Sequence, residues 1–196
     1  AGRDRTIRGP LDPARLMSGI NIHPVTTAAD LAAVVELCWA YRDFLYNFAP
    51  TERRIVETFY PHDKYSALMD RLAEEHARPR GIILLAERDG IPLGCGMSHA
   101  LSDTESEIKR VFVTDAARGT GAGRAICQRL IDQAREDGFE KVYLDTSIAF
   151  APARALYTSL GFIERGAYQP MPEFTRDAIC FYELPLTDIP ASAGSA

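Results

Sequence analysis

Apolar residues recur along this chain with two spacings, one typical of helices and one typical of strands. Helical spacing, three and four positions apart, follows Thr27 and continues through Leu45, and Thr27 with Asp30 has the form of a capping box. Prolines at 50, 61 and 79 interrupt the chain around the next such segment. We therefore expect helices at residues 28–45, 65–77, 119–137 and 151–159.

Strand-like runs separate these helices. An Asp89-Gly90 pair between two apolar runs predicts a hairpin of antiparallel strands. Strands are expected at residues 20–25, 82–87, 91–101, 105–113, 141–146 and 179–184, with a short one after Gly161-Phe162. Alternation in the 105–113 strand divides its side chains into two sets, one being Ile108, Arg110 and Phe112, the other Glu107, Lys109, Val111 and Val113.

The order of these elements predicts a mixed α/β fold with one β-α-β unit at its centre. A length of 196 residues favours one domain, which we place at residues 20–186. Residues 1–19 lack periodicity and are expected to form a flexible N-terminal extension, with Met17 a candidate natural start. Residues 187–196 are expected to form a C-terminal tail.

Charge and composition exclude several classes of protein. The net charge is -5 and the pI about 5.4, so the positive field that holds a nucleic-acid backbone is not expected. No apolar run is long enough to span a membrane and no signal peptide is recognisable, so we expect a cytoplasmic protein. The four scattered cysteines lack metal-ligand spacing, so reduced thiols and no metal are expected.

A glycine-rich turn at residues 118–123 follows one predicted strand and opens a helix. The first N–H groups of a helix lack intrahelical partners, and glycines let a phosphate approach them closely. Arg118 and Arg124 flank the turn with positive charge, so a diphosphate is the expected ligand. The turn lacks the ending of a P-loop, and the antiparallel strands before it argue against a dinucleotide fold. A turn that is glycine-rich only for tight turning remains the alternative.

Two motifs resemble the GNAT acetyltransferase superfamily. Arg118, Gly121 and Gly123 match its Gln/Arg-x-x-Gly-x-Gly/Ala coenzyme loop. Residues 153–162 look like its A-x-x-L-Y-x-x-x-G-F segment, preceded by a strand containing Leu144-Asp145-Thr146. The likeness covers residues 20–186.

The resemblance implies a twisted, mostly antiparallel sheet whose fourth and fifth strands splay apart to admit acetyl-CoA. It implies coenzyme contacts at Val111, Phe112, Val113, Arg118, Gly119, Thr120, Gly121, Ala122, Gly123 and Arg124. Many members carry Asn where this chain has Phe150, so that contact is not carried over.

The resemblance also implies direct attack of an amine on the thioester. Tyr157 matches the family tyrosine and is the expected proton donor, with packing of its helix as the alternative. Glu107 is the expected base, directly or through water, with a solvated carboxylate as the alternative. His62 and His99 are weaker candidates because neither has a visible partner, and an acyl-cysteine at Cys95 or Cys127 is disfavoured for lack of a nearby histidine.

The acceptor is expected to be a primary amine of a small molecule or peptide, with no nucleic-acid or membrane partner; the sequence leaves a homodimer open. An aromatic cluster between residues 39 and 60 belongs mostly to the core, with Tyr46 and Tyr60 as candidate acceptor contacts. The run 165–176 is expected to form a loop between the last two strands, either an ordinary hairpin loop or a cover over the acceptor. A non-catalytic acyl-CoA sensor and an enzyme for a longer acyl group remain alternative functions.

Overall fold

A mixed seven-stranded sheet forms the centre of residues 19–186, which are the residues that the computed structural model describes. Residues 1–18 of the expected extension, with the candidate start at Met17, and the expected tail at 187–196 lie outside them. The strand order is β1-β2-β3-β4-β5-β7-β6, and every neighbouring pair is antiparallel except β4 with β5. The strands are β1 (Asn21–Pro24), β2 (Gly81–Arg88), β3 (Ile91–Ala100), β4 (Glu105–Val113), β5 (Lys141–Ser147), β6 (Ile163–Arg165) and β7 (Ile179–Pro185).

Six α-helices accompany the sheet in this part of the chain: α2 (Ala28–Phe48), α3 (Pro50–Phe59), α4 (His62–Asp70), α5 (Leu72–Glu75), α6 (Ala122–Glu136) and α7 (Ala151–Ser159). Short 3₁₀ turns are η1 (Asp115–Ala117) and η2 (Glu173–Thr175). The capping box of Thr27 and Asp30 is confirmed. None of the helices at residues 19–186 combines the length and apolar character needed to cross a membrane.

The sequence prediction was incomplete between residues 46 and 80. The predicted helix 65–77 begins earlier, at His62, and is divided at Arg71 into α4 and α5. Helix α3 was missed because Pro50 suggested a break. Proline is well tolerated in the first helical turn, where its missing N–H would have no intrahelical partner, and Pro50 occupies that turn.

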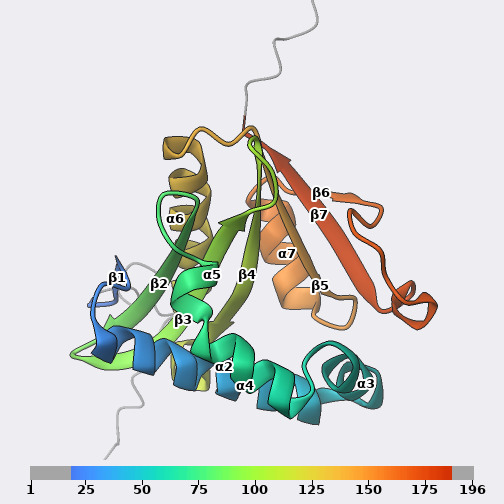
Figure 1. Cartoon of the computed structure of the whole chain (residues 1–196), viewed down its shortest axis with the longest axis horizontal. Coiled ribbons are helices and arrows are strands. Elements are labelled where there is room, and N and C mark those ends of the chain that lie inside the picture. Colours follow the sequence, from blue (N-terminus) through green and yellow to red (C-terminus); the bar gives the residue numbers. More distant parts are fainter. Residues whose placement is uncertain (1–18, 187–196) are drawn as a thin grey trace, which may run out of the picture.

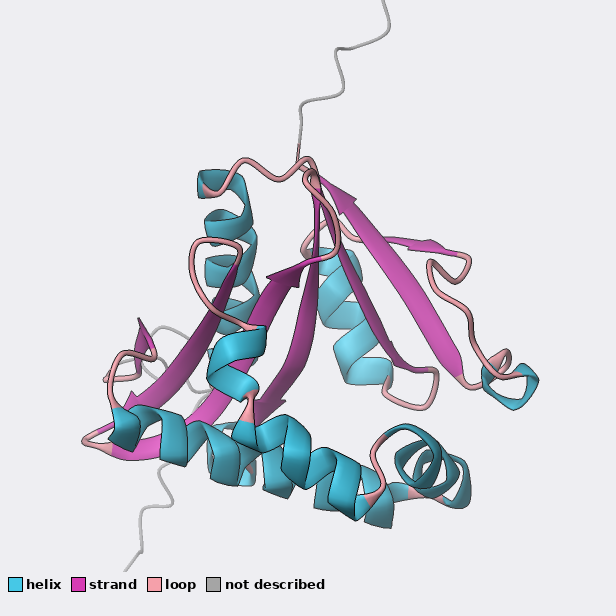
Figure 2. Ribbon diagram, in the orientation of Figure 1, coloured by secondary structure: helices cyan, strands magenta, loops and turns pink. Residues whose placement is uncertain are grey.

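Helices cover both faces of the sheet, and α3 lies beyond the end of α2 (Figures 1 and 2). Helix α6 buries Ile126, Leu130 and Ile131 on one face, in a core that also includes Tyr157 of α7. Helices α2, α4 and α5 bury a second core against the other face, including Val34, Met69 and Leu72. Each face of the sheet is therefore covered by its own amphipathic helices.

A β-bulge in β4 overturns the simple alternation expected for that strand. Cys95 is paired with Phe112 and Met97 with Lys109, so β4 has one residue more than β3 in this interval. Arg110 in the bulge has a φ of 50°. Past the bulge the two faces exchange: Val111 packs on the α6 side with Ile108, whereas Phe112 joins the other core. Glu107 therefore shares its face with Phe112 and not with Val111 and Val113.

Strands β4 and β5 pair for only three residues and then separate. Their parallel register runs from Glu105 with Lys141 to Glu107 with Tyr143. Figure 1 shows the two strands diverging from that end of the sheet. The splayed fourth and fifth strands expected from the sequence are confirmed, and the backbone of β4 beyond Glu107 is not paired with β5.

Candidate active site

A cavity of about 880 Å³ lies where β4 and β5 separate. Helices α2 and α3, the glycine-rich turn, α7 and the loop between β6 and β7 complete its wall. The size matches a small-molecule or cofactor site. One end of this cavity contains the turn, and we call the other end the acceptor end, defined by Arg42, Tyr60, Lys109, Arg110 and Asp145.

The glycine-rich turn presents backbone to this cavity. Gly119 and Gly121 have φ values of 75° and 88°, a conformation that side chains rarely adopt, and both line the cavity with Gly123. Gly121 is the N-cap of α6, so the unpaired N–H groups and positive dipole end of that helix lie here. Thr120 supports the turn by donating from its hydroxyl to the Ala117 carbonyl at 2.7 Å. This end is suited to a phosphate group.

The two arginines that flank the turn also line the cavity. Arg118 forms an ion pair with Asp115 at 2.8 Å and lies over the Phe44 ring, 5.2 Å from its centroid. Arg124 donates to the Ser159 hydroxyl at 2.6 Å. Both guanidinium groups are thus fixed beside the helix terminus, and they add positive charge to it.

Residues 111–113 of β4 form the wall between the turn and the acceptor end. The Thr114 amide donates to the Leu93 carbonyl of β3 at 2.8 Å. Because backbone groups alternate in direction along a strand, those of Val113 and Val111 face the β5 side, and those of Phe112 face β3. Val111 and Val113 therefore offer unpaired backbone groups to the cavity, whereas Phe112 contributes its ring.

Tyr157 projects from α7 into the cavity wall and is 7% exposed. Its ring packs against Phe162 and Tyr182, each at 6.0 Å between centroids. Burial, with smaller contributions from neighbours such as Cys127, raises the pKa of its phenol well above the ordinary value. Tyr157 therefore both packs its helix and keeps a protonated hydroxyl at the cavity.

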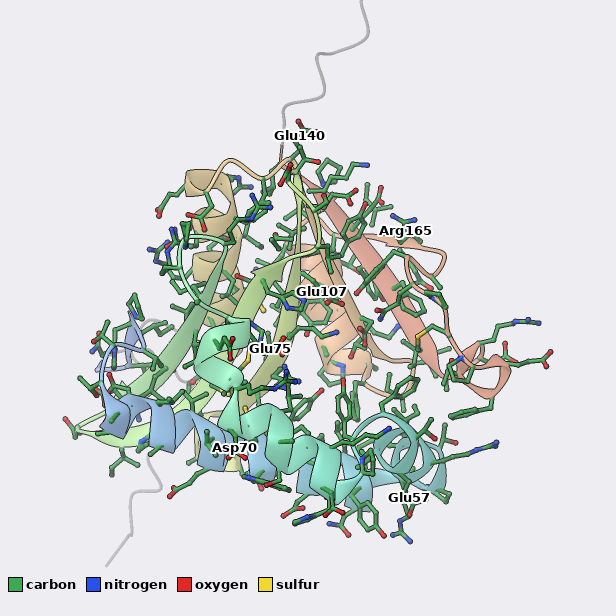
Figure 3. The ribbon with its side chains drawn as sticks, viewed as in Figure 1. Glu57, Asp70, Glu75, Glu107, Glu140 and Arg165 are labelled. Carbon is green, nitrogen blue, oxygen red and sulfur yellow. The ribbon has the colours of Figure 1, made fainter. Side chains whose placement is uncertain are left out.

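Glu107 is buried at the point where β4 and β5 part (Figure 3). Its carboxylate accepts from Lys109 Nζ at 2.9 Å and from the Tyr168 hydroxyl at 2.5 Å, and His99 Nε2 lies 3.0 Å away. Burial raises its pKa, but the His99 contact, the Lys109 charge and the Tyr168 bond outweigh burial and bring the pKa to about 2. Glu107 is thus charged near neutral pH and contacts three side chains.

Glu107, the expected base, is not part of the cavity wall. Asp145 on β5 lines the cavity instead. Its carboxylate lies 3.6 Å from Lys109 Nζ and 3.5 Å from the Tyr168 hydroxyl. Burial is the main cause that raises the pKa of Asp145 above its ordinary value, against the charge of Lys109. A carboxylate that faces the cavity with a raised pKa is a better proton acceptor than one held near 2.

Lys109 and Tyr168 connect the two carboxylates. Burial lowers the pKa of Lys109, but Asp145, Tyr60 and Glu107 outweigh it and hold that pKa above its ordinary value. Tyr168 comes from the loop between β6 and β7, and Gln169 and Met171 of the same loop line the cavity. The loop thus covers part of the cavity, as one of the two interpretations of run 165–176 expected.

Other sequence-based candidates have different outcomes. Tyr60 lines the acceptor end, whereas Tyr46 is not in the cavity wall and packs its ring against Arg42 and Arg53. The interpretation of His99 as unpartnered was wrong, because it contacts Glu107 across the β3–β4 pair. His62 is exposed, and its ring lies tilted against that of Trp39 with 5.0 Å between centroids.

The structure gives no support to an acyl-cysteine intermediate at Cys95 or Cys127. Cys95 and Cys127 are both buried and neither lines the cavity. Burial raises the pKa of the Cys127 thiol to about 12, which suppresses the reactive thiolate. Phe150, which replaces an asparagine of the family pattern, lies in the cavity wall and packs against Phe44 and Phe48.

Sequence reasoning passed over two further charged groups in the wall. Glu52 of the unpredicted helix α3 is 4% exposed and accepts from the Ser147 hydroxyl at 2.6 Å. Arg110 faces the cavity because of the bulge. Periodicity could not indicate either residue as a site residue, because Glu52 belongs to a helix that was not predicted and the position of Arg110 depends on a register shift.

Comparison with known proteins identifies one family and related sequences. Residues 43–162 match the sequence profile of the Acetyltransferase (GNAT) family. Over 132 residues the chain is 37% identical to the IAA acetyltransferase of Azospirillum brasilense. The aligned region covers 62% of this chain and 85% of that protein.

Two solved structures share the fold. The yncA protein of Salmonella typhimurium, solved with its cofactor acetyl-CoA, has a TM-score of 0.61 and 21% identity, covering 91% of this chain and 100% of that chain. A ribosomal-protein-alanine N-acetyltransferase of Brucella melitensis has a TM-score of 0.59 and 26% identity, covering 85% of this chain and 99% of that chain.

The charge of Glu107 predicts a pH-dependent stability. Its pKa is about 2 in the folded protein against an ordinary 4.5, so its stabilisation is complete above pH 4.5 and is lost as pH falls towards 2. The loss is roughly 2 kcal/mol by pH 3. Urea unfolding should therefore give a wild-type minus Glu107→Gln difference that shrinks by this amount between pH 6 and 3.

Taking that difference removes the titration of unaltered groups such as His76, whose burial lowers its pKa to about 4. Glu136→Gln, on the exposed side of α6, serves as the matched control for removal of a surface charge, and its difference should change much less. A constant difference for Glu107→Gln would contradict the charged cluster.

Proposed function

The chain belongs to the acetyltransferase (GNAT) family, and on that premise we propose that it transfers an acetyl group from acetyl-CoA to a primary amine by direct attack. The protein is an acyltransferase by its family. The observation that carries the finer proposal is that the glycine-rich turn, the edge of β4 not paired with β5, Tyr157 and Asp145 all face one cavity.

The residues around the turn fit the coenzyme. Two glycines with left-handed φ at the start of α6 leave its N–H groups accessible, and Arg118 and Arg124 lie beside them. Val111 and Val113 would bind the amide-rich arm through the backbone. When bound there, the coenzyme supplies the activated thioester that the amine attacks.

Proton transfers assign the two remaining roles. The Asp145 carboxylate first takes a proton from the bound ammonium, and the neutral nitrogen then bonds the acetyl carbon. As the carbon–sulfur bond breaks, the Tyr157 phenol gives its proton to the thiolate, and the nitrogen, which becomes the amide, gives its surplus proton to the resulting phenolate. Glu107 acts in this scheme as a positioning residue that holds Lys109 and Tyr168 beside Asp145.

The acceptor class stays open between small molecules and peptides. The relative in Brucella melitensis is named for an alanine of a ribosomal protein. The alternative function, a non-catalytic acyl-CoA sensor, would need neither Tyr157 nor Asp145 at the cavity. The presence of both in its wall favours an enzyme.

Coenzyme affinity should depend on the glycine-rich turn. Gly121→Glu places a bulky negative side chain where the phosphate is expected, so calorimetry should show at least about a tenfold loss of CoA affinity. Gly138→Glu is the matched control, because Gly138 ends the same helix with a φ of 81° against 88° for Gly121. Unchanged affinity in Gly121→Glu would remove the coenzyme site from this turn.

Tyr157→Phe should lower kcat about 100-fold, the lower range for loss of a general acid, while CoA affinity is retained. The measurement is thiol release from acetyl-CoA across a panel of amines. Tyr143→Phe, a change on β5 outside the cavity wall, should be nearly silent. Tight acetyl-CoA binding by wild type without thiol release for any amine would favour the sensor.

Asp145→Asn should lower kcat/KM by about 100-fold near neutral pH. The deficit should shrink as pH rises towards the pKa of the acceptor amine, because an amine that is already neutral needs no base. Asp132→Asn on the surface of α6 is the control. A deficit that is the same at every pH would assign Asp145 a merely structural role.

A further inference from the structure

Arg110 is a cation in the cavity wall without an anionic partner. Its Nε atom is buried and makes no hydrogen bond, and one terminal nitrogen lies 3.9 Å from the Met97 sulfur, which is a weak acceptor. None of the ion pairs formed within residues 19–186 includes Arg110. Arg110 is half-buried, and a guanidinium with a buried, unbonded nitrogen gains stability when a ligand supplies an anion.

The other two cations of the acceptor end are already paired. Lys109 lies between Glu107, at 2.9 Å, and Asp145, at 3.6 Å. Arg42 lies 3.9 Å from Asp43 and donates to the Tyr60 carbonyl at 2.9 Å. Among the described cations of the acceptor end, Arg110 is therefore the one available to an incoming anion.

The backbone gives this arginine an unusual position. Its φ of 50° lies in the left-handed region, which is uncommon for a long side chain. The β-bulge that includes it directs its side chain to the face of Lys109 and Phe112. Bulges beside active sites commonly redirect a side chain in this way, so the geometry is that of a binding residue.

We propose that the acceptor carries a carboxylate as well as its amine, and that Arg110 binds this carboxylate. The substrate class is then an amino acid or a related small amino-carboxylic acid. A guanidinium binds a carboxylate with two parallel hydrogen bonds, which orients the ligand as well as holding it. Asp145 receives the amine at the same end, so one wall offers opposite charges to the two ends of a zwitterion.

This inference rests on the proposed function, and one competing acceptor has support of its own. Glu52 is a buried wall carboxylate whose partner, Ser147, is neutral. It would favour a second positive group, as in a diamine. The same experiment separates the two substrates.

The test compares kcat/KM for amino acids, their carboxamides and the corresponding amines and diamines. The enzymes are wild type, Arg110→Asn and the surface control Arg135→Gln. Asparagine tolerates positive φ, so Arg110→Asn keeps the bulge. Wild type and Arg135→Gln should prefer at least one acid over its own amide by about 10- to 100-fold, and Arg110→Asn should lose that preference.

The acid-to-amide ratio does not depend on how much of a variant is folded, because both substrates meet the same enzyme. A wild type without this preference, a preference for diamines, or a preference that survives in Arg110→Asn would overturn the proposal while acetylation itself stands. If no amine is acetylated, the proposed function fails. Calorimetry with amino acids in the presence of CoA then decides, and an absence of Arg110-dependent binding overturns the carboxylate site as well.

Discussion

The short pairing between β4 and β5 is the constraint on which the site depends. These strands share three register pairs and then separate, so one edge of β4 loses its neighbour inside the fold. Unpaired backbone groups are costly when buried and therefore need another partner. A cavity lined by Val111 and Val113 on one side and by β5 and α7 on the other provides the place for that partner.

Two local features convert this opening into a site with distinct ends. At one end, left-handed glycines start α6 and expose its N–H groups beside two arginines. At the other, the bulge at Arg110 shifts the side chains of β4 by one position. It thereby brings Arg110 to the same face as Lys109, whose Nζ lies 3.6 Å from the Asp145 carboxylate. The expected phosphate site and the residues proposed to transfer protons therefore lie at different points along β4.

The charged cluster around Glu107 connects the covering loop to the sheet. Tyr168 reaches across from the β6–β7 loop to Glu107, and its ring lies 4.9 Å from that of Tyr143 on β5. On α3, Arg54 lies 4.1 Å from the centroid of the Phe174 ring in the same loop. The loop is therefore held at both the sheet and α3, and the acceptor end is bounded by elements distant in sequence.

Periodicity and turn chemistry predicted most of the fold, including the Asp89-Gly90 hairpin, the Thr27 cap and the glycine-rich turn. These features depend on residues near one another in sequence. The β4 bulge is a property of the β3–β4 register and cannot be found from alternation alone. Simple alternation therefore wrongly grouped Glu107 with Val111 and Val113. Asp145 and Lys109 were visible only as strand residues, because their meeting depends on the pairing of β4 with β5.

The central claim is that the free edge of β4 receives the coenzyme, and amide hydrogen exchange tests it most directly. Exchange at the Val111 and Val113 amides should slow when CoA is added, because the bound arm takes the place of the missing strand. Amides of β2, paired on both sides, serve as the internal reference. CoA binding that leaves exchange at Val111 and Val113 unchanged would contradict the account.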